Sequence, residues 1–185
     1  MMQPPRLQAL LREIVTRERH DPHDEVVRLV VRLRARDACE YCLLATNSQF
    51  QVDHIIPPAL WHDYAASRLR YVPCVPGSVG PDHVDNFAWS CAFCNTAKRQ
   101  QVTYRVGSRT FRLFNPRRDH WPDHFVFFHT YLLIIGLVGI GQATQQLLGF
   151  NDSRLSGPLG PRHDAVLSGT YPPSWARAWT ATGNP

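Results

Sequence analysis

The sequence predicts an α+β fold with one principal core. Three observations point to it: apolar residues at helical spacing near the N-terminus, short runs rich in β-branched and aromatic residues further along, and two Cys-x-x-Cys pairs separated by a long insertion. With 185 residues, 44% of them hydrophobic, the chain is long enough for one domain with appendages.

The N-terminal segment, residues 1–37, is predicted to be helical. Apolar residues recur there at helical spacing and predict a first helix, which ends near residues 20–22: Leu7, Leu10, Leu11, Ile14 and Val15. Asp24 can cap a second helix that runs to about residue 36. The β-branched valines of that stretch leave a strand as the alternative.

The middle of the chain has the signals of a strand followed by a long loop. Residues 49–56 form a short segment rich in residues that favour β-strands, which indicates a strand with Asp53 and His54 at its end. Residues 57–81 are irregular and hold several Pro and Gly, so we expect a loop with one short helix around residues 61–69. Cys74 lies in this loop, outside both cysteine pairs, and is interpreted as a solitary thiol.

Residues 102–150 are predicted to form a C-terminal β/α extension. A helix should follow Cys94 to about residue 101, and a hairpin should then turn at Gly107 and Ser108. The apolar run 125–140 predicts two buried strands, because it is shorter than the ~18 residues that a membrane span needs. A last helix is expected over 142–148, followed by a Gly- and Pro-rich tail over 151–185.

The charge balance favours a polyanionic partner. The formal net charge is +5 and the pI is about 9.2, which attracts nucleic acid to any positive groove, although many basic proteins bind none. The first residues lack the pattern of a secretory signal, so a cytoplasmic location is expected. In a reducing compartment, paired cysteines indicate a metal site and not disulfides.

The two pairs offer a complete set of ligands for a structural zinc ion: Cys39, Cys42, Cys91 and Cys94. A simple zinc ribbon places its second pair ~15 to 20 residues after the first. Here the separation is much longer, so the zinc ion is expected to hold together the two ends of an inserted unit. Iron is the main alternative, because rubredoxin-like and iron–sulfur sites also use four thiolates.

The inserted unit carries three motifs in a fixed order: "VDHIIP" at 52–57, "DHVDNF" at 82–87 and "CAFCNTAK" at 91–98. This order resembles the HNH endonuclease family, in particular the branch with paired Cys-x-x-Cys knuckles that is similar to the domain of McrA-type restriction nucleases. The resemblance covers about residues 38–99, and the interval 57–82 is longer than in many members of the family.

The resemblance implies a ββα-metal (His-Me finger) core over residues 38–101, with one divalent ion between a hairpin and a helix. His54 matches the general base, and Asp53 and Asn95 match the ligands of the catalytic ion. Asn86 matches the residue that braces the hairpin loop and positions the base. Since Asn95 stands where other members carry a histidine, Mg²⁺ or Mn²⁺ is the expected ion. His54 and Asn95 are expected to face one shared ion pocket.

These residue types suit the hydrolysis of a DNA phosphodiester. The reaction needs an activated water molecule and a cation that neutralises charge on the phosphate and the leaving oxygen. A histidine that titrates near pH ~6.5 can accept the proton, and carboxylate and amide oxygens are ligands for hard cations. Lys98 and Arg99 are expected to contact neighbouring phosphates.

Two other functions fit part of this pattern. A zinc-dependent nucleic-acid-binding protein without catalysis shares the cysteines and the charge but needs neither Asp53 nor His54. A redox or iron protein shares only the thiolates. Taken singly, Asp53 with His54 is an ordinary strand-end pair, Asn86 a turn residue and Asn95 a helix cap. Arg117 and Arg118 are interpreted as solvated side chains, with phosphate contact as the alternative.

Overall fold

The computed structural model of the chain describes residues 9, 14, 19–45, 49–66, 68, 80–153 and 157–179. Of the expected first helix, Ala9 and Ile14 are described and helical, whereas Arg19 and His20, at its expected end, are described and not helical. Cys74 lies outside the described residues.

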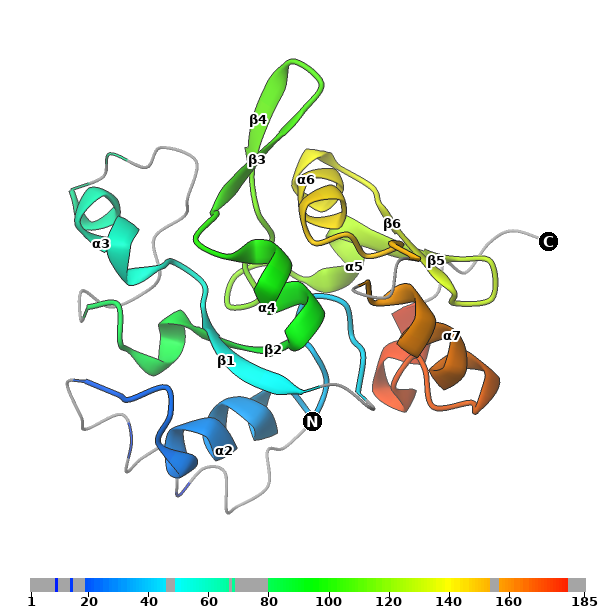
Figure 1. Ribbon diagram of the computed structural model, residues 1–185, viewed down its shortest axis with the longest axis horizontal. Helices are drawn as coiled ribbons and strands as arrows, with labels where there is room; N and C mark the ends of the chain where they lie inside the picture. The colour runs from blue at the N-terminus through cyan, green and yellow to red at the C-terminus, as the bar shows by residue number, and fades with distance from the viewer. Residues whose placement is uncertain are drawn as a thin grey trace.

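Helices and short antiparallel hairpins alternate along the chain, which confirms the α+β prediction (Figure 1). The helices are α2 (Glu25–Arg34), α3 (Pro58–Ala65), α4 (Ala92–Lys98), α5 (Trp121–His124), α6 (Gly139–Leu147) and α7 (Leu159–Leu167), with 3-10 turns η1 (Val84–Asn86) and η2 (Ser174–Trp179). The strands pair as β1 (Phe50–His54) with β2 (Phe87–Cys91), β3 (Thr103–Val106) with β4 (Arg109–Arg112), and β5 (Phe125–Phe128) with β6 (Leu133–Gly136).

Helix α2 forms where the capping residue predicted it. The Asp24 carboxylate accepts hydrogen bonds from the backbone N–H groups of Val26 and Val27, at 2.7 and 3.2 Å. The apolar side of α2 then packs on the β1–β2 ribbon, where Val27 and Val30 are buried with Phe87. Capping and this burial outweigh the strand preference of the valines.

The β1–β2 ribbon lies between α2 and α4 (Figure 1). Asp53 pairs with Ala88, and His54 pairs with Phe87. Side chains alternate along a strand, so Val52 and His54 face the side of α2 while Asp53 faces α4. The side chains of Asp53 and His54, which are consecutive in the motif, therefore face opposite sides of the ribbon.

The extension contains the predicted hairpin and two further strands. Gly107 has a φ of +59° at the β3–β4 turn, which glycine adopts without strain, and this hairpin projects beside α6 (Figure 1). In the β5–β6 pair, Phe125 and Ile134 are buried, whereas Phe128 is 61% exposed. The prediction of two buried strands is therefore correct for only one face. None of the described helices is long and apolar enough to cross a membrane.

The segment predicted to be a tail is folded over residues 157–179. It forms α7 and η2, and Ala165, Tyr171 and Ala176 are buried in the same core as the four paired cysteines. Apolar and aromatic side chains distributed between the Gly and Pro residues supply this packing, so the tail prediction is wrong for the described part of the segment.

Candidate functional site

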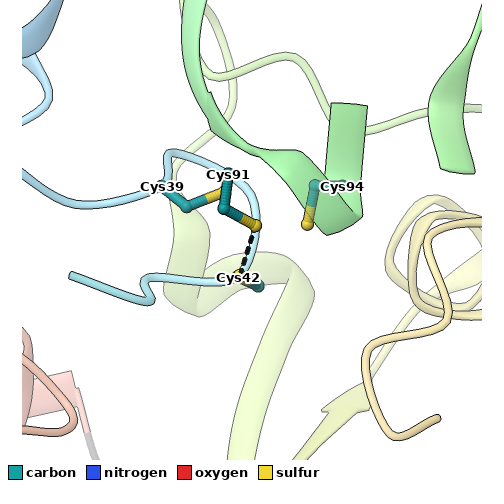
Figure 2. Close-up of side chains that lie close together, drawn as sticks. All are labelled: Cys39, Cys42, Cys91 and Cys94. Carbon is teal, nitrogen blue, oxygen red and sulfur yellow. Dashed lines mark hydrogen bonds between the residues drawn. The ribbon is translucent and has the colours of Figure 1, made fainter. Parts of the chain in front are cut away.

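The four paired cysteines come together at one end of the β1–β2 ribbon (Figure 2). Cys39 and Cys42 lie in the loop after α2, Cys91 ends β2, and Cys94 lies in the first turn of α4. All four sulfur atoms lie within 4.8 Å of one another, and the Sγ atoms of Cys42 and Cys91 are 3.8 Å apart. Tetrahedral ligands at ~2.3 Å from a zinc ion are separated by about the same 3.8 Å.

The donor set fits a divalent metal ion. All four cysteines are free and fully buried, and the 3.8 Å separation of Cys42 and Cys91 is far longer than a ~2.05 Å disulfide bond. Interaction with Cys39 raises the pKa of Cys91, and burial raises the pKa of Cys94, while hydrogen bonding from Cys39 lowers that of Cys42. Four thiolates can be buried this close together only when a cation neutralises their charge, and a structural ion such as zinc does so.

The C-terminal extension fixes the first cysteine pair. The indole N–H of Trp121 donates to the Tyr41 carbonyl at 2.9 Å, and the Tyr171 hydroxyl donates to the Cys42 carbonyl at 2.9 Å. Burial raises the pKa of Tyr171 well above its ordinary value, so its hydroxyl remains a donor. These two contacts join residues 80 and 129 positions apart, and no local motif predicts them.

Asp53 is buried in an ion pair with Lys98. Its carboxylate accepts hydrogen bonds from Lys98 Nζ at 3.1 Å and from the Tyr41 hydroxyl at 2.7 Å. Lys98 Nζ also donates to the His54 carbonyl at 2.7 Å. Burial, followed by the charge of Asp53, raises the pKa of Tyr41 well above its ordinary value. Lys98 is 2% exposed, so the prediction that it contacts phosphates is wrong for this conformation.

Asn95 lies on the same side of β1 as Asp53. Its Nδ2 donates to Oε1 of Gln51, which precedes Asp53 by two residues and therefore shares its face of the strand. The two predicted ligands of the catalytic ion are thus both directed into the space between β1 and α4. Arg99 follows at the C-cap of α4 and is exposed.

His54 is directed to the other side of the ribbon. Its Nε2 lies 3.1 Å from Oδ1 of Asp82, and its ring meets Phe87 edge-on, with centroids 4.9 Å apart. The expectation that His54 and Asn95 face one shared pocket is not met, because consecutive residues of a strand alternate between its faces. The two sides meet only at the end of β1, where Lys98 reaches the His54 carbonyl.

Asn86 ties the end of β1 to the loop before β2. Its Oδ1 accepts from Ile56 N at 3.0 Å, and its Nδ2 donates to the carbonyls of Ile56 and Pro81, each at 2.8 Å. The side chain is fully buried. Asn86 therefore holds together the residues just after His54 and just before Asp82. This position suits the bracing role expected for it.

Arg117 is neither solvated nor directed to an external phosphate. It is buried in an ion pair with Glu40, and burial lowers its pKa well below the ordinary arginine value. Glu40 in turn accepts a hydrogen bond from Trp89 N at 2.8 Å. This pair connects the first cysteine loop to β2 and to the extension.

Three residues of the site were not singled out from the sequence: Tyr41, Gln51 and Asp82. Gln51 precedes Asp53 by two, so strand alternation is a signal that could have identified it. Asp82 stands in "DHVDNF", but its contact with His54 spans 28 residues and has no local signature. Comparison with protein-family models, with curated proteins and with solved structures gives no match.

Proposed function

We propose that the protein is a metal-dependent HNH endonuclease that hydrolyses DNA phosphodiester bonds. In this proposal β1, β2 and α4 form the ββα-metal unit, and zinc on the four cysteines fixes one end of it. The observation that carries the proposal is the His54–Asp82 pair at the opposite end of the ribbon, with Nε2 and Oδ1 3.1 Å apart. A histidine oriented by a carboxylate is the arrangement of a general base.

His54 is the general base of the proposed reaction. When Nε2–H donates to Asp82, the neutral ring keeps its lone pair on Nδ1, which has no hydrogen-bond partner among the described residues. Nδ1 can then take a proton from a water molecule that attacks the phosphate. Phe87 against the ring and Asn86 beneath the loop limit the movement of both partners.

Asp53 and Asn95 are the residues that would hold Mg²⁺ or Mn²⁺, on the side of β1 opposite the His54 ring, so the phosphate would have to span the end of the strand to meet both. Such an ion supplies neutralisation of charge on the phosphate and on the leaving oxygen. The carboxylate of Asp53 already accepts hydrogen bonds from Tyr41 and Lys98, so in holding an ion it would have to share its oxygens with the Lys98 ammonium or release it. The exposed arginines that follow on α4 and the β3–β4 hairpin, Arg99, Arg105 and Arg109, offer phosphate contacts in place of Lys98.

A non-catalytic, zinc-dependent nucleic-acid-binding protein is the second candidate. One observation favours it: the Lys98–Asp53 pair is complete without a metal ion. In that case the Asp53 carboxylate is structural, and the zinc site and the positive charge alone serve the function.

Plasmid cleavage separates the two candidates. Supercoiled DNA is incubated with the zinc-loaded protein and Mg²⁺ or Mn²⁺, and DNA binding is followed by gel shift. We expect cleavage by the wild type and by His62→Ala, an exposed histidine on α3 that serves as the control. His54→Ala should bind DNA and not cut it. Cutting by His54→Ala at the wild-type rate contradicts the mechanism, and binding without cutting by the wild type supports the second candidate.

A further inference from the structure

A cavity of about 220 Å³ lies beside the zinc site, between the loop after α2, the start of α5 and η2. Its lining includes three tryptophans together with positively and negatively charged side chains, among them Trp121, Trp175, Trp179, Arg34, Arg36 and Glu40. We call it the tryptophan cavity. It uses no residue of the proposed cleavage reaction.

The indole rings give the cavity flat apolar walls. Trp121 and Trp179 are stacked at 6.0 Å with an interplanar angle of 21°, and Trp175 meets Trp179 edge-on at 5.2 Å. The hydrogen bond from Trp121 to the Tyr41 carbonyl fixes the first of these rings. Rings held in this way form a platform on which another planar ring can stack.

The charges of the lining leave a net positive site. Both carboxylates are already paired with arginines outside the lining: Asp119 with Arg112 at 2.7 Å, and Glu40 with Arg117. Arg36 has no carboxylate partner in the described part of the chain, and its guanidinium lies 5.1 Å from the Trp175 ring centroid. Arg34 is paired with Asp85 at 3.7 Å and donates to the carbonyls of Val84 and Phe87, so Arg36 supplies the uncompensated positive charge of the lining. The site therefore suits an anion that carries an aromatic ring, and disfavours a cation.

We infer that the tryptophan cavity binds the base of a nucleotide, with Arg36 near its phosphate. The volume is below the ~300 Å³ at which pockets for drug-sized ligands begin, so it accepts one ring system. An unpaired base presents such a ring, and it stacks on aromatic side chains with little dependence on sequence. The inference rests on the proposed function only in taking a DNA strand as the source of the base.

The position of the cavity relative to β2 supports that source. Glu40, in the lining, accepts a hydrogen bond from the backbone N–H of Trp89 in the middle of β2, and Cys39, also in the lining, belongs to the cysteine cluster at the Cys91 end of the ribbon, whereas His54 lies at the other end. Five paired residues place the two ends ~13 Å apart. A strand held by a stacked base at one end can thus extend along the ribbon towards His54.

Tryptophan fluorescence of the zinc-loaded full chain tests the inference. The protein is titrated with a short single-stranded oligonucleotide and, separately, with deoxyadenosine monophosphate. We expect saturable quenching by both ligands in the wild type. Trp179→Leu, which keeps an apolar side chain and removes the ring, should weaken the binding of both roughly tenfold or more. Trp61→Leu, on α3 outside the cavity, is the matched control and should bind as the wild type does.

Arg36→Gln provides a second variant with no buried ring removed. It should weaken binding of the monophosphate and leave its nucleoside unaffected. Affinities unchanged in both Trp179→Leu and Arg36→Gln, or quenching by neither ligand, overturn the inference. Plasmid cleavage measured on the same samples keeps the two proposals separate: cleavage without quenching refutes the cavity alone, and quenching without cleavage refutes the endonuclease alone.

Discussion

Lys98 Nζ lies 3.1 Å from the carboxylate of Asp53, and both side chains are almost fully buried. The pair joins α4 to β1 and neutralises a charge that is otherwise confined in the core. It is also the point at which a structural and a catalytic interpretation of Asp53 diverge, because a divalent ion and an ammonium group compete for the same oxygens.

Replacing Lys98 by methionine should destabilise the protein by about 3–5 kcal/mol, because removal of one partner leaves a buried charge unpaired. Urea unfolding measures this loss. Arg99→Met, at the exposed next position, should change stability little. If Asp53 is a metal ligand, Mg²⁺ should raise the Tm of Lys98→Met more than that of the wild type. An equal effect of Mg²⁺ on both proteins argues against a metal ion on Asp53.

Asn86→Ala should be among the most destabilising single substitutions in the ribbon. It leaves Ile56 N and the carbonyls of Ile56 and Pro81 without partners, and an unsatisfied buried group costs about 1–3 kcal/mol. Asn86→Asp retains the acceptor and loses both donors. Its stability should lie between that of the wild type and that of Asn86→Ala only when the new carboxyl group is protonated and therefore uncharged. Denaturant midpoints at pH 7 and pH 4 test this, because Asn86→Asp should recover at the lower pH.

Metal removal should unfold the cysteine end of the ribbon. We expect one zinc ion per chain by elemental analysis, and the Co²⁺-substituted protein should show the visible absorption of a tetrahedral thiolate site. Cys94→Ser should lower the metal content and the Tm together, since a structural metal contributes directly to folding. Cys74→Ser is the control and should retain full metal content. Iron in the purified protein, or a metal content that is unaffected in Cys94→Ser, contradicts the zinc assignment.

The surroundings of the His83 ring predict that the folded protein loses stability in acid. Burial lowers its pKa below the ordinary 6.5, and its Nδ1 accepts a hydrogen bond from Asp85 N, which requires a neutral ring. As the pH falls, the unfolded chain therefore takes up this proton before the folded chain does. The stabilisation contributed by the neutral His83 ring is complete above pH 6.5 and is lost as the pH falls below it. His83→Asn keeps a capping acceptor and does not titrate. Its Tm should fall less than that of the wild type between pH 7.5 and pH 5.

Local signals in the sequence predicted the local elements well. Asp24 caps α2, Gly107 turns the β3–β4 hairpin, and the β-rich run before the Asp53-His54 pair forms β1. In each case the information lies within a few residues of the element that it specifies. The cysteine spacing likewise predicted the cluster of four thiols, because few other arrangements suit two buried pairs.

Long-range packing was not predictable in the same way. Lys98 was expected to contact neighbouring phosphates, and only the carboxylate 45 positions earlier explains its buried location. The opposite directions of His54 and Asn95 follow from strand alternation once β1 is known to include His54. The folding of residues 157–179 depends on aromatic contacts with distant segments, which a composition rich in Gly and Pro conceals.

The hydroxyl of Tyr171 on the carbonyl of Cys42 has a consequence for how the chain matures on the ribosome. The first knuckle receives this support only after the chain has left the exit tunnel as far as residue 171. Shortened versions that end before residue 157 should therefore accumulate as metal-poor, protease-sensitive species, even though the four paired cysteines and the three motifs of the inserted unit are present in them.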